Sequence, residues 1–229
     1  MIELKNIKIG DGNPFVLIAG PCVVENESMV LSTAEKIKQI TSELNILFIF
    51  KSSYKKANRT SVDSFCGIGD EIALKIIAKV RSDFDVPVLT DVHTEEEAKV
   101  AAEFVDVLQI PAFLCRQTEL LVAAGKTGKV VNIKKGQFLA PADMQNAADK
   151  VLSTGNNKIM ITERGTTFGY NNLVVDMRSL VIMKEIGYPV VMDATHSVQM
   201  PGIGKVTGGI VSRQRKHQKT LDSYRRLVL

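Results

Sequence analysis

The chain has 229 residues, of which 45% are hydrophobic, and a net charge of +4. This length and composition suffice for one substantial core, and no Pro-, Gly- or Ser-rich linker divides the chain, so we expect a single domain over residues 1–229. No apolar run reaches the roughly 20 residues of a membrane-spanning helix, the N-terminus lacks the layout of a signal peptide, and three widely spaced cysteines make no disulfide framework. A reducing cytoplasm is therefore the expected location.

The positive charge is concentrated at one end of the chain. Residues 212–229 carry six Lys or Arg and one Asp, a net of +5, so the rest of the chain sums to −1. A body without a basic excess gives no compositional support for nucleic-acid binding. We expect neither a nucleic acid nor a membrane as the partner of this body.

Residues 2–15 alternate weakly between apolar and polar side chains, with Ile2, Leu4, Ile7 and Ile9 as the apolar set and a Gly-Asp-Gly turn at 10–12. Alternation with a period of two is typical of a β-strand. We therefore predict a small hairpin ahead of the first long apolar run, where it covers the bottom of the barrel predicted below.

Seven short apolar runs follow, and each of them ends in polar or ionisable residues. Uninterrupted apolar runs of this length suit strands that are buried on both faces, as in parallel sheets. The runs are residues 15–21, 46–50, 87–90, 107–113, 130–133, 159–162 and 189–192.

Helical patterns separate these runs. Apolar residues recur at helical spacing between Met29 and Leu44, and residues 94–97, Thr-Glu-Glu-Glu, match a capping box. Strands that alternate with helices form a parallel sheet with right-handed crossovers. Seven such units with functional groups at the strand ends predict an α/β fold, a (β/α)8 TIM barrel whose active site lies at that end. A doubly wound open sheet is the alternative, but no G-x-G-x-x-G motif follows the first strand.

The most informative segment is residues 51–61, Lys-Ser-Ser-Tyr-Lys-Lys-Ala-Asn-Arg-Thr-Ser, which directly follows an apolar run. Cations at the mouth of a buried strand need a partner for their charge. A small anion with several oxygens, such as a phosphate or a carboxylate, is the simplest partner. For any one lysine, a solvated loop is the alternative reading.

Residues 51–61 resemble the K-[AS]-S-[FY]-D-K-A-N-R-[ST]-S signature of the 3-deoxy-D-manno-octulosonate 8-phosphate synthase family. The related heptulosonate 7-phosphate synthases typically carry K-P-R-T where this chain has Lys-Ala-Asn-Arg at 56–59, which argues against them. The resemblance runs in unbroken order over residues 14–201, and its other motifs are residues 17–22, 90–93, 109–118, 132–138, 162–165, 168–174 and 193–199.

The resemblance implies an enzyme that condenses phosphoenolpyruvate with D-arabinose 5-phosphate. In that reaction C3 of the enol attacks the aldehyde, water adds at C2, and phosphate leaves by C–O cleavage. The product serves lipopolysaccharide (Kdo) biosynthesis in Gram-negative bacteria, and the resemblance also implies a homotetramer. The alternatives are a catalytically inactive remnant of the family, a heptulosonate 7-phosphate synthase, a sugar-phosphate or anion-binding protein, and a protein whose basic tail contacts RNA or a membrane.

The resemblance also implies roles for individual residues. Lys51, Ser53 and Lys56 would hold the phosphoenolpyruvate carboxylate, and its phosphate side would meet Gln109, Lys134 and Arg164. The pentose phosphate would meet Asn58, Arg59 and Thr60, with Asp91 near its hydroxyls, and Arg116 would reach the site of a neighbouring subunit. The expected catalytic residues are Lys51, Lys56, Asp91 and His196.

Cys22 and His196 resemble the first two of four ligands of a divalent metal in the metal-dependent members of this family. A thiolate and an imidazole suit Zn or Fe(II), and added carboxylates also suit Mn. Without the family context, a lone Cys is more often a small buried hydrophobe, and a lone His is more often a hydrogen-bonded core residue. The resemblance favours a metal-dependent enzyme.

Three features depart from the family pattern. Lys55 stands where the pattern has Asp, which places a like charge beside Lys56, and Cys66 stands where the pattern usually has Arg. After Gly209 the family's eighth strand, with a Glu and then an Asp, is not recognisable. Residues 210–229 instead form a basic tail with no strand-like run, which we interpret as a reading-frame shift shortly after Gly209; the alternative is a genuine, shortened homologue with a basic arm. The expected barrel therefore lacks its eighth βα unit and two metal ligands.

Overall fold

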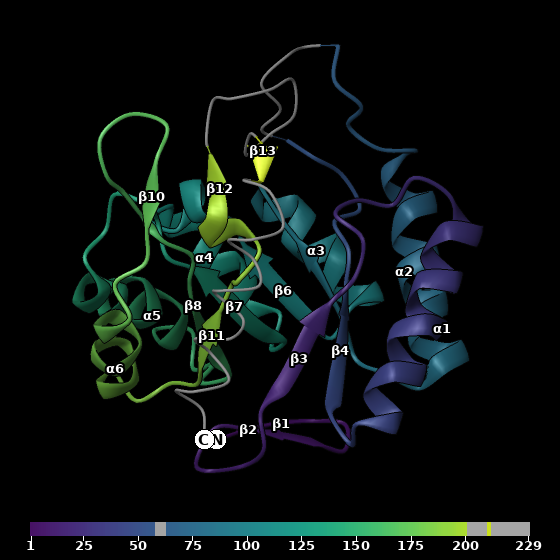
Figure 1. Ribbon diagram of the computed structural model, residues 1–229, viewed down its shortest axis with the longest axis horizontal. Helices are drawn as coiled ribbons and strands as arrows, with labels where there is room; N and C mark the ends of the chain where they lie inside the picture. The colour runs from purple at the N-terminus through teal and green to yellow at the C-terminus, as the bar shows by residue number, and fades with distance from the viewer. Residues whose placement is uncertain (58–62, 201–209, 212–229) are drawn as a thin grey trace.

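Seven parallel strands form the central sheet of the protein. The computed structural model describes residues 1–57, 63–200 and 210–211, and Figure 1 shows the sheet at the centre of the molecule. Every predicted apolar run contributes one strand to it. In spatial order the strands are β11 (Val190–Met192), β8 (Ile159–Glu163), β7 (Val130–Lys134), β6 (Val107–Ile110), β5 (Val88–Asp91), β4 (Leu47–Lys51) and β3 (Val16–Ala19).

The sheet is an incomplete barrel. All six strand pairings are parallel, and each strand pairs with the strand that precedes or follows it in the barrel order. Within the described residues no further strand joins β11 to β3, so the two edge strands remain unpaired on one side. The predicted (β/α)8 architecture without an eighth unit is confirmed.

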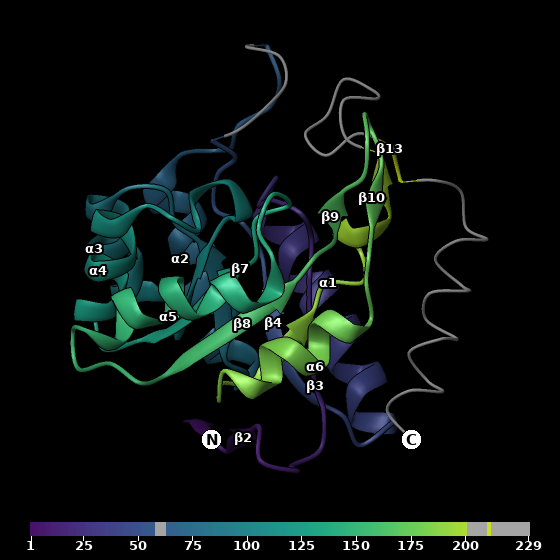
Figure 2. The ribbon, with the colours of Figure 1, turned by 90° about the vertical axis from the view of Figure 1, so that its left-hand side faces the viewer.

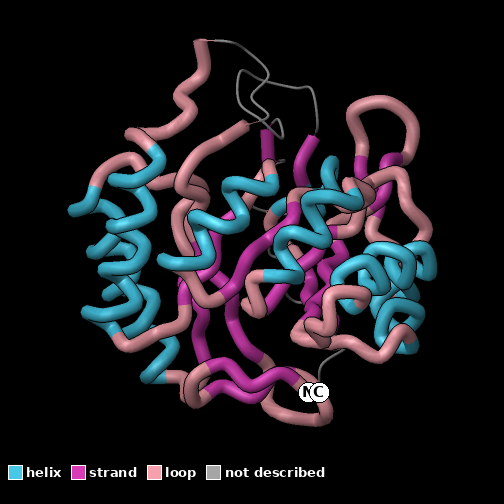
Figure 3. The backbone as a smooth tube through the Cα atoms, turned by 180° about the vertical axis from the view of Figure 1, so that it is seen from behind, coloured by secondary structure: helices cyan, strands magenta, loops and turns pink. Residues whose placement is uncertain are grey.

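Helices follow the strands and cover the outside of the sheet, as Figure 3 shows from behind. Two helix starts have side-chain caps: Asn26 accepts a hydrogen bond from the Met29 backbone N–H, and Thr94 accepts one from that of Glu97, as the capping-box pattern predicts. The helices are α1 (Glu27–Glu43), α2 (Asp70–Phe84), α3 (Glu95–Phe104), α4 (Thr118–Lys126), α5 (Met144–Leu152) and α6 (Arg178–Glu185).

The predicted N-terminal hairpin is present and closes one end of the barrel. Strands β1 (Ile2–Leu4) and β2 (Ile7–Ile9) pair antiparallel at the bottom of Figure 1. Their four apolar side chains are buried against inward-facing residues of the barrel strands, including Ile49, Leu89 and Met160. The hairpin therefore seals the barrel interior at the end opposite to the polar strand ends.

Short strands and 3-10 helices lie at the other end of the barrel, where the strands have their C-terminal ends. Strands β9 (Thr166–Thr167) and β10 (Leu173–Val174) form a hairpin that projects beyond α6 in Figure 2. We predicted no strand in residues 210–229, but β13 (Ile210–Val211) pairs antiparallel with β12 (Gln199–Met200), because backbone pairing with an extended neighbour needs little help from side chains. The remaining elements are the 3-10 helices η1 (Ala112–Leu114), η2 (Pro141–Asp143) and η3 (His196–Val198).

No helix in the described part of the chain is both long enough and apolar enough to cross a membrane.

Candidate active site

A row of buried polar side chains crosses the C-terminal ends of four neighbouring strands. Gln109 of β6 donates from Nε2 to Oδ1 of Asp91 at 2.5 Å, and its Oε1 accepts from Asn132 Nδ2 at 2.9 Å. Thr162 of β8 then donates to Asn132 Oδ1 at 2.7 Å. Asp91, Gln109 and Asn132 are direct register partners in the sheet. The parallel pairing therefore places one polar side chain from each of three neighbouring strands at one level.

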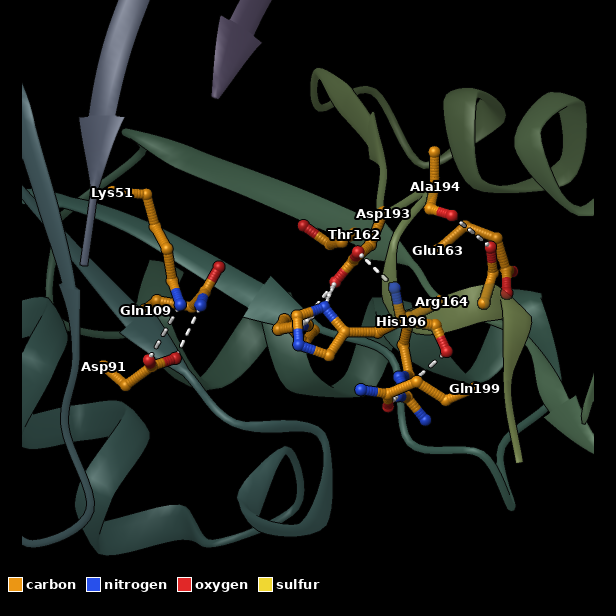
Figure 4. Close-up of polar contacts among 12 residues, drawn as sticks. Lys51, Asp91, Gln109, Thr162, Glu163, Arg164, Asp193, Ala194, His196 and Gln199 are labelled. Carbon is orange, nitrogen blue, oxygen red and sulfur yellow. Dashed lines mark hydrogen bonds and ion pairs between the residues drawn. The ribbon is translucent and has the colours of Figure 1, made fainter. Parts of the chain in front are cut away.

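Three residues at and after the end of β4 extend this row. Ser53 donates to Oδ2 of Asp91, and its own hydroxyl oxygen lies 2.7 Å from Lys56 Nζ and 3.3 Å from Lys51 Nζ. Lys51 Nζ is also 3.6 Å from Asp91 Oδ2, and Figure 4 shows the side-chain nitrogens of Lys51 and Gln109 next to each other, each facing the carboxylate of Asp91. The structure thus brings together Lys51, Ser53, Lys56, Asp91 and Gln109.

Asp91 is held as a carboxylate. Burial alone would raise its pKa, but the charges of Lys51, Lys56 and Lys134 outweigh burial and hold the pKa of Asp91 well below its ordinary value. The neighbouring Lys56 behaves in the opposite way, because burial and the like charge of Lys51 lower its pKa. Two crowded ammonium groups around one carboxylate leave the site with surplus positive charge.

A second cluster lies at the ends of β7 and β11. Lys134 Nζ is 2.6 Å from Asp193 Oδ2, and His196 Nδ1 is 2.6 Å from the same oxygen. The backbone N–H of His196 donates to Asp193 Oδ1 at 2.9 Å. Burial, followed by the charge of Lys134, lowers the pKa of His196. The imidazole is therefore fixed through Nδ1 and favoured in its neutral form.

Arg164, after β8, adds a buried guanidinium beside this cluster. One nitrogen, Nη2, donates to Gln199 Oε1 at 3.2 Å and to the His196 carbonyl oxygen at 3.4 Å. Its Nε and Nη1 are buried and have no hydrogen-bond partner among the described residues. A buried donor without a partner costs about 1–3 kcal/mol or more, so these two nitrogens are placed for an acceptor that the described residues do not supply.

Cys22 lies beside the first cluster. Gly20 makes the close approach of its segment to β4 possible, because a Cβ at Gly20 would lie 2.0 Å from the Lys51 carbonyl oxygen. The Cys22 side chain interacts with Lys56 and is exposed. Cys22 and His196 are two plausible metal ligands, but no three His, Cys, Asp or Glu residues of the described segments converge to hold a metal ion. The described residues therefore fit a metal only in part.

Several predicted site residues are not brought into these clusters. Asn58, Arg59 and Thr60 lie outside the described residues. Arg116 has an exposed side chain, and its carbonyl oxygen accepts from Lys150. Gln109 was expected on the phosphate side, yet both ends of its amide are engaged in the buried row.

His93, two residues after Asp91, is hydrogen-bonded to Glu97. Its Nδ1 and its backbone N–H both lie 2.8 Å from Oε2 of Glu97. We did not single out Asn132, Thr162 or Asp193 as site residues, although each of them stands at or just after the end of a predicted strand. That position was the signal by which they could have been found.

Comparisons with known proteins agree with this geometry. The family model described as the DAHP synthetase I family matches residues 1–220. The 2-dehydro-3-deoxyphosphooctonate aldolase of Geotalea uraniireducens (strain Rf4) is 60% identical over 209 residues, which cover 91% of this chain and 77% of the relative. The protein of the same name from Rickettsia rickettsii (strain Sheila Smith) is 57% identical over 222 residues, which cover 96% of this chain and 80% of the relative.

A third relative of this name, from Geobacter sulfurreducens (strain ATCC 51573 / DSM 12127 / PCA), is 57% identical over 201 residues, covering 88% of this chain and 74% of the relative. The sequence identity and the extent of the match with the family model determine the family of this chain. The chain belongs to the DAHP synthetase I family.

Proposed function

We propose that this protein condenses phosphoenolpyruvate with D-arabinose 5-phosphate to give 3-deoxy-D-manno-octulosonate 8-phosphate and phosphate. The relatives' name, 2-dehydro-3-deoxyphosphooctonate aldolase, describes an eight-carbon phosphorylated keto acid formed in an aldol-type reaction. A three-carbon enol and a five-carbon aldose phosphate account for that skeleton. The product belongs to lipopolysaccharide (Kdo) biosynthesis.

The observation that carries this proposal is the pair of buried, unpartnered nitrogens of Arg164 beside Lys134. Guanidinium groups are common phosphate ligands in proteins, and these two nitrogens are charged donors that a phosphate oxygen can accept from. Across the same sheet end, Lys51 and Lys56 converge on one hydroxyl. Two separate cationic groups match the phosphate and the carboxylate of phosphoenolpyruvate.

The roles follow from these positions. Lys51, Ser53 and Lys56 hold the substrate carboxylate, whereas Lys134 and Arg164 hold the phosphate that leaves. Asp91 stays ionised between the two groups and meets the hydroxyls of the sugar phosphate.

Gln109 donates one N–H to Asp91 and accepts from Asn132, and we propose that it orients Asp91. Asn58, Arg59 and Thr60 remain our proposed contacts to the pentose phosphate.

We further propose that the enzyme is metal-dependent, with Cys22 and His196 among the ligands. The hydrogen bond from His196 Nδ1 to Asp193 supports this, because a metal-binding imidazole usually has its other nitrogen fixed by a carboxylate. A bound Zn, Fe(II) or Mn would act as a Lewis acid toward the aldehyde oxygen. Elemental analysis of purified protein, before and after dialysis against a chelator, tests this: no metal in either sample, with full activity, would contradict it.

A homotetramer in the cytoplasm is also part of the proposal. The exposed side chain of Arg116, close to the sheet end that holds the site, supports a contribution to a neighbouring site. Light scattering after size exclusion measures the assembly, and Arg116→Ala tests the contribution: activity should fall while the mass of the assembly is unchanged.

Product identity tests the proposed reaction. Purified protein is incubated with phosphoenolpyruvate and an equimolar mixture of arabinose 5-phosphate and erythrose 4-phosphate. Mass spectrometry then gives the masses of the products. The eight-carbon product is expected. A seven-carbon product would indicate a heptulosonate 7-phosphate synthase, and no product would indicate an inactive member of the family.

A further inference from the structure

Lys55, which stands where the family signature has Asp, has its charge turned away from the substrate site. Its neighbours Ser53 and Lys56 face Asp91. Lys55 Nζ instead lies 2.7 Å from Glu97 Oε1 and 2.8 Å from Asp70 Oδ2. The like charge beside Lys56 is therefore balanced by two carboxylates, one at the start of α2 and one in the first turn of α3.

Glu97 is the centre of this second cluster. Its Oε2 accepts from the backbone N–H and from the ring of His93, each at 2.8 Å. The buried Tyr54 also hydrogen-bonds to the Glu97 carboxylate, and Lys55 Nζ lies 5.4 Å from the centre of the Tyr54 ring. Burial would raise the pKa of Glu97, but these hydrogen bonds lower it to about 2. Glu97 is thus a fixed anion at neutral pH.

The cluster joins two loops that also meet inside the site. The loop after β4 carries Ser53 and Lys56, and the segment after β5 leads from Asp91 to Glu97. Ser53 bonds Asp91 on the inner side, and Lys55 pairs with Glu97 on the outer side. Two contacts on opposite sides of one loop restrict its rotation.

Such restraint matters because of the charges around Ser53. Lys51 and Lys56 both approach its hydroxyl, and their ammonium groups repel one another. Without a bound anion this repulsion favours an outward movement of Lys56. The backbone N–H of Lys56 donates to the Cys66 carbonyl oxygen at 2.8 Å, so an anchored Lys55 and this bond hold the backbone of Lys56 from both sides.

We propose that Lys55 and Glu97 are a pair of positioning residues that hold Ser53 and Lys56 ready for an anionic substrate and so set the affinity for phosphoenolpyruvate. This inference rests on the proposed function for the identity of the substrate. It adds two residues, outside the substrate site, to those that determine recognition.

The test compares Lys55→Met, Glu97→Gln and the double variant with Lys75→Met. Lys75 is a matched control, because it pairs with Glu71 at 2.6 Å on the exposed face of α2. Each single variant should raise the KM for phosphoenolpyruvate about tenfold, the double variant should add little more, and kcat should change by less than about twofold, as for a group that acts on ground-state binding. A lower kcat at an unchanged KM, the sign of a smaller folded fraction, would overturn the proposal, as would additive effects.

Hydrogen–deuterium exchange separates this inference from the proposed function. Backbone exchange over residues 51–57 without substrate should be at least about fivefold faster in Lys55→Met than in the unsubstituted chain or in Lys75→Met. Unchanged exchange would overturn the positioning role whether or not the enzyme turns over. An unsubstituted chain that makes no eight-carbon product, together with faster exchange in Lys55→Met, would refute the proposed function alone.

Discussion

The ammonium of Lys134 lies 2.6 Å from Oδ2 of Asp193, and this oxygen also accepts from Nδ1 of His196. The contact joins the ends of β7 and β11, with β8 between them in the sheet. Burial would raise the pKa of Asp193, but Lys134 and His196 hold it well below its ordinary value. One carboxylate therefore compensates a cation and orients an imidazole.

Lys134→Met should raise the pKa of His196. Burial is the larger cause of its lowered value, and the charge of Lys134 is the next. Removing that charge also leaves Asp193 free to favour the protonated ring. Titration of the histidine C–H resonances by NMR measures the midpoint, which lies below 6.5 in the unsubstituted protein. If the titration midpoint of His196 falls or stays the same in this variant, the charge of Lys134 does not lower its pKa. Lys99→Met is the control, because the Lys99 side chain is exposed.

The same lowered pKa fixes the sign of the pH effect on stability. The folded state binds a proton at His196 less readily than the unfolded state does. The contribution of His196 to stability is thus complete above its ordinary value of 6.5 and is lost as the pH falls below it.

Arg164→Lys should weaken phosphoenolpyruvate binding by about 2 kcal/mol, because one ammonium cannot replace the two unpartnered guanidinium nitrogens. Isothermal titration calorimetry measures the affinity. Arg178→Lys is the matched control, because the Arg178 side chain is 85% exposed and pairs only with Asp176 in the described chain. Equal affinities in the two variants would remove Arg164 from the substrate site.

Asn132→Leu should lower the free energy of unfolding by about 1–3 kcal/mol, the usual result of leaving buried polar groups unpaired. Both Gln109 Oε1 and Thr162 Oγ1 lose their partner in this variant. Urea denaturation gives the value. The control is Gln145→Leu, since the bond from Gln145 to Asp149 is exposed. If both variants unfold at the same urea concentration, the polar row does not contribute to the stability of the folded state.

Ile7→Ala should lower the free energy of unfolding by about 2–4 kcal/mol, because Ile7 is 3% exposed and fills the closed end of the barrel. The substitution leaves a cavity between the hairpin and the strands. Thermal unfolding followed by circular dichroism measures the change against Lys8→Ala, which alters the exposed face of β2. If the melting temperature is the same in Ile7→Ala and in Lys8→Ala, the hairpin does not stabilise the barrel.

The strands of the barrel could be predicted because burial on both faces requires uninterrupted apolar runs. Residues 159–162 illustrate this, since all the residues of β8 are buried. The hairpin of β9 and β10 could not be predicted in the same way. Its strands have two residues each and exposed or half-buried side chains, so backbone pairing creates them without an apolar pattern.

The site could be predicted only as far as strand ends determine it. Lys51 and Asp91 meet because parallel strands end at one level. The partners of Lys55 could not be foreseen, because the sequence separates it from Glu97 by two elements, β5 and α2. Such pairs depend on helix placement, which apolar periodicity does not specify.

The most direct test of the proposed condensation is the release of phosphate from phosphoenolpyruvate by the purified 229-residue chain. The assay is run with and without arabinose 5-phosphate, and with metal-supplemented and chelator-treated protein. We predict release that depends strictly on arabinose 5-phosphate, together with one eight-carbon product for each phosphate. Release that is independent of the sugar phosphate, or no release from folded protein that binds phosphoenolpyruvate, would contradict the proposed condensation.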